Sequence, residues 1–272
     1  MTLRTLYIEG LGFWAPTLPG WDIARLALRG EQLPQTYPAP IPKPMGLPSA
    51  ERRRAPDTVS LALAVSEAAT LASGRGPDEL MAVFASAHGD LPTIDYLCTT
   101  LAQAPLMVSP TRFLHTIHNA PLGVWSLLWG NGHNHNVVSA AEFSFAAGLL
   151  EAAILAETSQ KAVLLVGYDT AATGALVNTT RSQGALAVAM VLHASASART
   201  QTRMDWGISP NPGVACEPHT AAARSLPTNG MSQALPLYEA LALNRSTELS
   251  MPLSAYQRLQ LTVQPLKSTA EN

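Results

Sequence analysis

A short apolar strand turns directly into a helix at Val137-Val138-Ser139-Ala140-Ala141-Glu142-Phe143-Ser144-Phe145-Ala146-Ala147-Gly148. The paired valines favour a strand, and the run after Glu142 is so apolar and so poor in charge that it favours a buried helix. A side chain on a sharp turn of this kind lies at the helix N-terminus, where a thiolate or an oxyanion is stabilised. Glu142 therefore brings a negative charge to a position that suits a nucleophile.

Strands and helices alternate on both sides of this turn. The patterns predict strands over 5–13, 81–86, 136–140, 161–167 and 184–192. They predict helices over 21–29, 50–73, 92–104, 121–129 and 143–157. One further helix is opened by Ser109 as N-cap with Pro110 at the first helical position. This β-α-β-α order implies a mainly parallel sheet with helices on both faces.

The composition divides the chain into three segments. Residues 1–194 carry the alternating pattern and are expected to form one α/β domain. Residues 195–230 are polar and rich in Pro, Ala and Ser, which predicts a loop or linker. Residues 231–272 contain a helix near 232–243 and two alternating strands, about 247–253 and 256–263. We expect this helix and hairpin to pack on the same domain.

The chain is unusually poor in charge. Charged residues make up 13% of it and hydrophobic residues 47%, whereas an ordinary soluble domain has about 25% charged residues. No apolar run reaches the roughly 18 residues of a transmembrane helix, so the apolar surplus predicts a large permanent protein interface. A net charge of −2 shows no excess of basic residues of the kind that nucleic-acid binding requires.

Other compositional features point to the compartment and to possible docking. The N-terminus enters a strand without an apolar signal segment, and Cys98 and Cys216 are too few and too separated for a disulfide framework. Both features predict a cytoplasmic protein. The run Arg52–Arg54 is explained either by docking to an acidic carrier or by a solvated helix start.

Two motifs that bind cofactors or metals in other proteins are interpreted as structural features in this chain. Gly10-Leu11-Gly12-Phe13-Trp14-Ala15 matches a dinucleotide fingerprint, but Pro16 and Pro19 prevent the helix that should begin inside it, so we interpret it as a tight turn. His133 and His135 have no third ligand at metal-binding spacing and are interpreted as a solvated turn. The sequence predicts no metal site and no bound cofactor.

Several segments together resemble the N-terminal half of a β-ketoacyl synthase. Members of that family have a helix opened by Ser-Pro, then an Asn and a Gly, and a Thr-Ala-Cys turn. The similar segments here are Ser109-Pro110-Thr111-Arg112-Phe113, Ile117-His118-Asn119-Ala120, Gly123 and Ser139-Ala140-Ala141-Glu142-Phe143-Ser144. The resemblance covers roughly residues 5–193. Within the family, Ala85-Ser86-Ala87-His88-Gly89-Asp90 is similar to stand-alone, chain length factor type members of aryl polyene pathways.

The resemblance implies a thiolase-like half-domain, in which helices cover both faces of a mainly parallel or mixed five-stranded sheet. It also implies two losses. Glu142 stands where the family carries its acyl-bearing cysteine, and after residue 193 only His219 remains of the histidines that a condensing enzyme needs in its C-terminal half. The resemblance therefore implies that this chain is not a condensing enzyme on its own.

The expected role is a chain length factor type subunit that pairs with a complete β-ketoacyl synthase in polyene or fatty-acid-like polyketide synthesis. The family implies that the strand Asn136-Val137-Val138-Ser139-Ala140 pairs across the dimer. It implies that Tyr96, Arg112 and Phe113 face the partner and its acyl tunnel. An acyl carrier protein is a second expected partner, and its acyl-phosphopantetheine is a possible contact.

Glu142 has three interpretations at this stage. Ser139 and Glu142 match a capping box, worth about 1 kcal/mol to a helix start. Alternatively, Glu142 plugs a vestigial acyl pocket. A third possibility is a general base, which requires apolar burial against Phe143 and Phe145.

Two other functions remain open. One is a truncated thiolase-like hydrolase or acyltransferase that uses Glu142 with His115 or His118. The alternative to a catalytic role is that both histidines pack against and cap a buried helix. The other function is a homodimeric module that binds an acyl carrier without controlling chain length.

Overall fold

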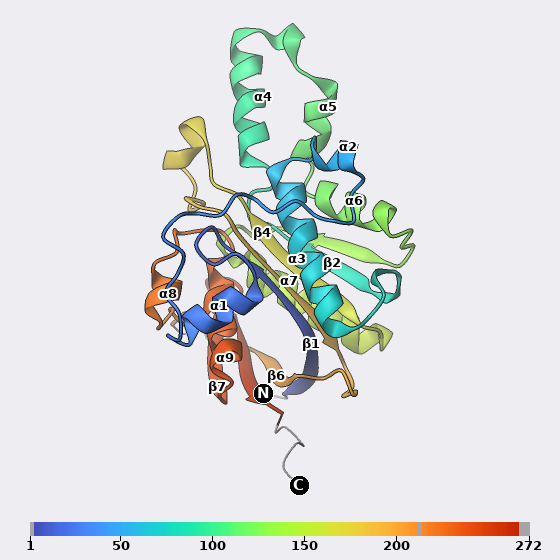
Figure 1. The fold of residues 1–272 in the computed structure, drawn as a ribbon, viewed down its shortest axis with the longest axis vertical. Coiled ribbons are helices and arrows are strands. Elements are labelled where there is room, and N and C mark those ends of the chain that lie inside the picture. The colour runs from blue at the N-terminus through green and yellow to red at the C-terminus, as the bar shows by residue number, and fades with distance from the viewer. Residues whose placement is uncertain (1–2, 211–213, 267–272) are drawn as a thin grey trace.

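The chain folds around one strongly twisted sheet, which the computed structural model describes together with its helices for residues 3–210 and 214–266 (Figure 1). The sheet has eight strands in the order β3-β2-β4-β5-β1-β6-β8-β7. Their bounds are β1 (Arg4–Trp14), β2 (Met81–Ala85), β3 (His135–Val138), β4 (Val163–Asp169), β5 (Leu186–His193), β6 (Thr202–Ser209), β7 (Thr247–Pro252) and β8 (Arg258–Pro265).

The five predicted strands lie together at one end of the sheet as β3-β2-β4-β5-β1, and three more strands extend it. β2 runs parallel to β3 and β4. The pairings of β5 with β4 and β1, and those of β6 and β8, are antiparallel. The prediction of a mixed α/β sheet with a C-terminal helix and hairpin is confirmed. The sheet has eight strands, however, and only the pairings of β2 are parallel.

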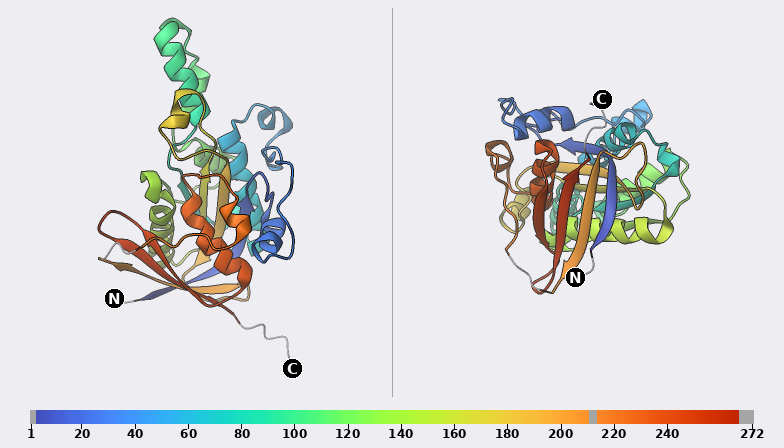
Figure 2. Two further views of the ribbon diagram at one scale, coloured as in Figure 1. Left: turned by 90° about the vertical axis from the view of Figure 1, so that its left-hand side faces the viewer. Right: turned by 90° about the horizontal axis from the view of Figure 1, so that it is seen from below.

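The largest correction concerns residues 195–230, which were expected to be a loop. They contain β6, which lies between β1 and β8, and the one-turn helix α8 (Ala221–Arg224). Met204 and Trp206 of β6 are buried in the core, whereas Arg203 before them is half-buried. β6 joins the C-terminal hairpin to the rest of the sheet, at the end of the molecule opposite α4 (Figure 2).

Helices cover both faces of the sheet, as predicted. On one face, α3 (Asp57–Ser73) and α6 (Ala120–Leu128) pack on side chains such as Phe84 and Leu164. On the other, α7 (Ser144–Ser159) packs on Val83 and Leu165, in a core that it shares with α1 (Trp21–Leu28) and α9 (Leu235–Leu243). The C-terminal helix thus folds back onto the same domain.

Two glycines of β1 allow α3 to approach the sheet closely. A Cβ on Gly10 would lie 2.2 Å from the Ala69 carbonyl oxygen, and one on Gly12 would lie 2.2 Å from the Val65 carbonyl oxygen. The predicted tight turn at Gly10–Ala15 was therefore wrong, because residues 10–14 continue β1. The glycine pair is a packing motif, in which the missing side chains leave room for the helix backbone.

The helix predicted over 50–73 is two helices. α2 (Ser49–Arg52) ends before Pro56, and α3 begins at Asp57. Proline disfavours a helical conformation in the residue before it, and this separates the two segments. Among the described residues, no helix is long and apolar enough to cross a membrane.

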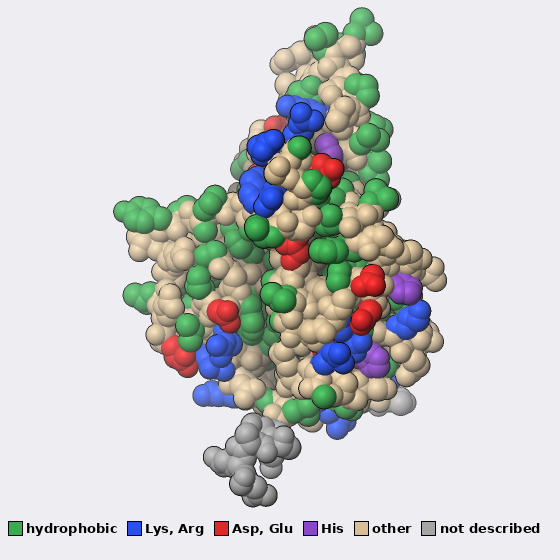
Figure 3. Space-filling view, turned by 45° about the vertical axis from the view of Figure 1, so that its right-hand side comes forward, with side chains coloured by type: hydrophobic (Ala, Val, Ile, Leu, Met, Phe, Trp, Pro, Cys, Tyr) green, Lys and Arg blue, Asp and Glu red, His purple; other side chains and the backbone are tan. Residues whose placement is uncertain are grey.

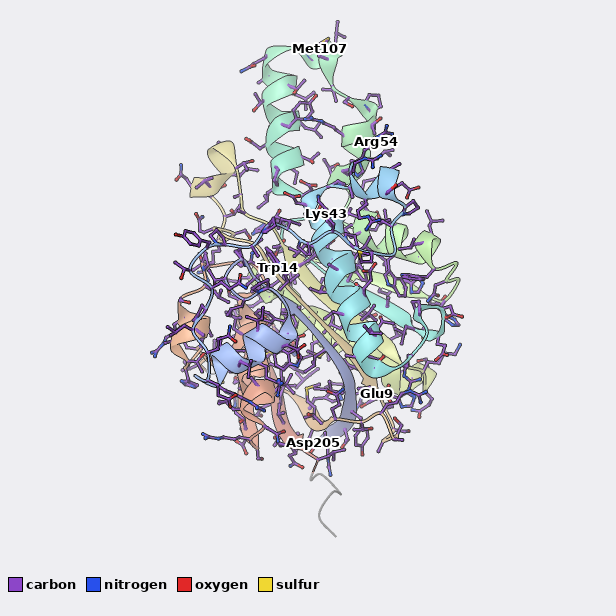
Figure 4. The ribbon with its side chains drawn as sticks, viewed as in Figure 1. Glu9, Trp14, Lys43, Arg54, Met107 and Asp205 are labelled. Carbon is purple, nitrogen blue, oxygen red and sulfur yellow. The ribbon has the colours of Figure 1, made fainter. Side chains whose placement is uncertain are left out.

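One segment projects from the body of the protein. We call residues 91–117 the arm; it contains α4 (Leu91–Gln103) and α5 (Pro110–Phe113), with 3₁₀ turns at Pro105–Met107 and Leu114–Thr116. Met107 lies at its tip and Arg54 beside its base (Figure 4). Asp90 fixes that base, because its carboxylate accepts hydrogen bonds from the Thr93 amide and the Thr58 hydroxyl, both at 3.0 Å.

Candidate functional site

The strand-to-helix turn of residues 139–144 is strained. β3 ends at Val138, a 3₁₀ turn covers Ala141–Phe143, and α7 begins at Ser144. Ala141 has φ 50°, a left-handed value that costs a residue with a Cβ about 1 kcal/mol or more. The buried Ser144 hydroxyl holds this geometry, because it accepts from the Ala140 amide at 2.9 Å and donates to the Ala141 carbonyl at 2.7 Å.

The capping box predicted for Ser139 and Glu142 does not form. The Ser139 hydroxyl is directed to the Ala87 carbonyl oxygen at 3.4 Å, which ties the turn to the residues after β2. α7 begins five residues after Ser139, and this separation is too long for a serine to cap the first turn. The stabilising role expected of Ser139 belongs instead to Ser144.

Glu142 points outward. Its side chain is 49% exposed, and its carboxylate lies 3.1 Å from the guanidinium of Arg181, which is itself 77% exposed. Glu142 is therefore not buried against Phe143 and Phe145, as the general-base interpretation requires. An outward carboxylate also does not fill the interior beneath the turn.

The left-handed residue of the turn is Ala141 rather than Glu142. Sharp strand-to-helix turns present their reactive side chain from the residue held in the strained conformation, as in a nucleophile elbow. The vestigial nucleophile position predicted from the motif, Glu142, directly follows this strained residue.

We expect Glu142→Ala to lower the unfolding free energy by less than about 1 kcal/mol, because exposed ion pairs contribute little. The matched variant is Ser144→Ala, which leaves the Ala140 amide without its acceptor and should cost about 1–3 kcal/mol. Urea denaturation of both variants measures the difference. A larger loss for Glu142→Ala than for Ser144→Ala would contradict the assignment of the turn to Ser144.

A buried carboxylate lies below the turn, at the carboxyl end of β4. Asp169 is fully buried, and its oxygens accept from the Ser86 hydroxyl at 2.7 Å, the Ala87 amide at 3.0 Å and the His88 amide at 3.2 Å. Burial raises the pKa of Asp169 to about 6, although these hydrogen bonds oppose the shift. The sequence analysis missed this residue. Its only local signal is an acid that ends the apolar run Val163–Asp169.

The histidines of the hydrolase alternative lie apart from Glu142. The His118 ring lies beside Gly89, and its backbone carbonyl accepts from the Tyr168 hydroxyl at 3.0 Å. His115 lines a mostly apolar pocket of about 210 Å³ at the base of the arm. Burial and the neighbouring charge of His118 lower the pKa of His88. No described contact joins Glu142 to these imidazoles, so the geometry offers no acid–base pair.

The His133 and His135 pair is not solvated as a whole. His135 begins β3, and its Nδ1 accepts from the Ala82 amide at 3.1 Å. This hydrogen bond ties His135 to β2, and burial lowers the pKa of its imidazole. Within residues 3–210 and 214–266, no group of three metal-binding side chains comes together.

The predicted partner-facing residues lie on the arm. Tyr96 is on α4, and Arg112 and Phe113 are on α5; the guanidinium carbon of Arg112 stands 4.0 Å from the centre of the Tyr96 ring. Phe113 is 56% exposed. The structure thus brings Tyr96 and Arg112 together and leaves Phe113 open to a partner.

The predicted pairing strand lies at an edge of the sheet. In the described sheet β3 pairs only with β2, so its other side is open. The strand is four residues long, His135–Val138. It therefore includes the predicted Asn136, Val137 and Val138, whereas Ser139 and Ala140 belong to the turn.

A family model described as the N-terminal domain of β-ketoacyl synthase matches residues 29–256. A structure of the ketosynthase ApeO in complex with its chain length factor ApeC from Xenorhabdus doucetiae is similar, with a TM-score of 0.72, 20% identity, and 95% of this chain and 99% of that chain covered. The ishigamide ketosynthase/chain length factor matches with a TM-score of 0.69, 15% identity and coverage of 97% and 100%.

A third structure describes a type II polyketide acyl-carrier protein with its ketosynthase, AntDE:AntF, and matches with a TM-score of 0.72, 10% identity and coverage of 97% and 100%. At these identities the likeness shows the fold, which is the ketosynthase fold of the thiolase type. The comparison with curated proteins found no match.

Proposed function

Because this chain belongs to the β-ketoacyl synthase family, through the N-terminal domain that matches most of its length, we propose that it is a non-catalytic subunit of the chain length factor type. It pairs with a complete ketosynthase in polyene or fatty-acid-like polyketide synthesis. The absence of a nucleophile is supported by glutamate at position 142. His219, the only histidine after residue 193, uses its backbone amide to bind Glu239.

The observation that best supports pairing with a ketosynthase is the apolar surface of the arm. Its exposed large side chains are Leu101, Leu106, Met107, Phe113, Leu114 and Ile117. Leu106 is 99% exposed at the tip, and hydrophobic side chains follow the arm in the space-filling view (Figure 3). An apolar projection of this size in water is stabilised by burial against another protein. The arm is therefore the main contact with the partner.

The open edge of β3 supplies a second contact. An unpaired edge is a template for a strand of another chain, and β3 carries no proline that would block the added hydrogen bonds. Pairing there places the strained turn of residues 139–144 next to the partner subunit. Tyr96, Arg112 and Phe113 then lie where the two subunits meet, and Phe113 limits the space for a growing acyl chain.

An acyl carrier protein is the second proposed partner. Arg52, Arg53 and Arg54 make no ion pair among the described residues, and Arg54 lies beside α5 at the base of the arm (Figure 4). Lys and Arg side chains gather below the arm in Figure 3. A cluster of one sign attracts an acidic protein and makes the association sensitive to salt.

The test is co-expression with a ketosynthase encoded beside this chain. We expect the two proteins to co-purify, and we expect Phe113→Ala to lengthen the product, because it removes a large side chain from the end of the acyl tunnel. Leu71→Ala, which changes a more exposed apolar residue near the end of α3, is the control and should leave product length unchanged. Failure to co-purify, together with an unchanged product after Phe113→Ala, would rule out the proposal.

A further inference from the structure

Arg112 is the only Lys or Arg of the arm, whose exposed side chains are otherwise largely apolar. Between Arg75 and Lys161 it is the only Lys or Arg in the sequence. Its neighbours Phe113 and Leu114 are both exposed and apolar. Any protein that covers the arm must therefore cover this guanidinium as well.

The guanidinium of Arg112 is held in place by an aromatic ring, but no carboxylate neutralises its charge among the described residues. It lies against the Tyr96 ring at 4.0 Å, and α5 is fixed by the Ser109 hydroxyl, which accepts from the Arg112 amide at 3.4 Å. Among the described residues Arg112 has no carboxylate partner within ion-pair distance. Stacking uses one face of the guanidinium and leaves its N–H edges free, so the group is oriented in advance for a planar acceptor.

Burying this charge without an anion would oppose association. An ionised group that loses water and gains no partner carries a large desolvation penalty. The same argument applies to an alkyl chain in a tunnel, which offers no acceptor to an arginine. A carboxylate does match the fork of the guanidinium, through two parallel hydrogen bonds.

We propose that Arg112 is an interface anchor that binds an aspartate or glutamate of the partner ketosynthase, within an otherwise apolar contact. This inference rests on the proposed pairing. It separates the roles of two adjacent residues, because successive positions on a helix differ by about 100° in direction. Arg112 binds the partner protein, whereas Phe113 limits the acyl tunnel.

The experiment measures binding of the purified chain to the neighbouring ketosynthase by biolayer interferometry at low and high salt. Arg112→Met keeps the length and the packing of the side chain but removes the charge. We expect it to weaken binding by at least about 30-fold, because a buried carboxylate of the partner loses its counter-ion. Arg245→Met, in the exposed turn before β7, is the matched control and should bind as the wild type does.

Further variants and outcomes separate the inference from the proposed function. Arg112→Lys should restore part of the affinity, and Arg112→Met should show a weaker dependence on salt than the wild type. If the wild-type chain does not bind the ketosynthase, the proposed function itself fails. If it binds and Arg112→Met binds equally well, only the anchor is overturned. A homodimer of this chain alone that Arg112→Met disrupts would show that a second copy is the occupant, and would also overturn the assignment.

Discussion

Gly10→Ala is expected to destabilise the protein by at least about 3 kcal/mol, at the upper end of what overpacking costs. The added Cβ would lie 2.2 Å from the Ala69 carbonyl oxygen and 2.6 Å from the Ser73 amide nitrogen. Both atoms belong to the backbone of α3, so relief requires the helix to move from the sheet rather than a side chain to rotate. Small domains have only about 5–15 kcal/mol of stability in total.

Urea denaturation of Gly10→Ala beside Gly123→Ala measures this effect. Gly123 lies within α6, and a Cβ there meets nothing within 4 Å. Its replacement by alanine should be neutral or stabilising by up to about 1 kcal/mol, because alanine is the better helix former. Equal stabilities of the two variants would show that α3 does not lie as close to β1 as the structure places it.

Asp169 is expected to make the protein less stable as the pH rises from 4 to 7. Its pKa is raised by burial from 3.8 to about 6, so the native state binds a proton that the unfolded chain has already released. The resulting stability is fully present below pH 4 and is lost as the pH rises through about 6. A difference of about 2 pKa units corresponds to about 3 kcal/mol.

The measurement compares the unfolding free energy of the wild type and Asp169→Asn across this pH range. The curve of the variant is subtracted from that of the wild type, because Glu9 changes the pH dependence of stability in the opposite direction. Burial raises its pKa, but hydrogen bonds from Arg75 and Ser197 and the charge of Arg75 outweigh burial and lower it, so its contribution is lost as the pH falls. The wild type should lose about 3 kcal/mol relative to the variant between pH 4 and pH 7. Parallel curves would refute a raised pKa at Asp169.

Local sequence patterns were sufficient to predict most strands and helices of the N-terminal domain. The helices around Asp57–Ser73 and Ser144–Ser159 are apolar on nearly all sides, and such segments are stable only between other layers. The order of strands and helices predicted a layered α/β fold, and the motifs from Ser109 to Ser144 predicted the family. These features are encoded by neighbours in the sequence, so they can be found without the tertiary structure.

The strand Thr202–Ser209 could not be identified in the same way. It mixes Arg203 and Asp205 with buried Met204 and Trp206, and it lies in a polar, proline-containing region. Its stability comes from pairing with β1, almost 200 residues earlier, and with β8. Strand preference depends on such neighbours more than on the residues themselves, which explains why this segment was predicted to be a loop.

The sequence alone determined the family and the layered fold, because both are a matter of residue type, order and local periodicity. Only the tertiary structure placed the strain at Ala141, turned Glu142 toward Arg181 and gathered Ser86, Ala87 and His88 around Asp169. It also set Arg112 against Tyr96. Those arrangements depend on contacts between distant segments and on which side chains lose water, and these contacts exist only once the chain has folded.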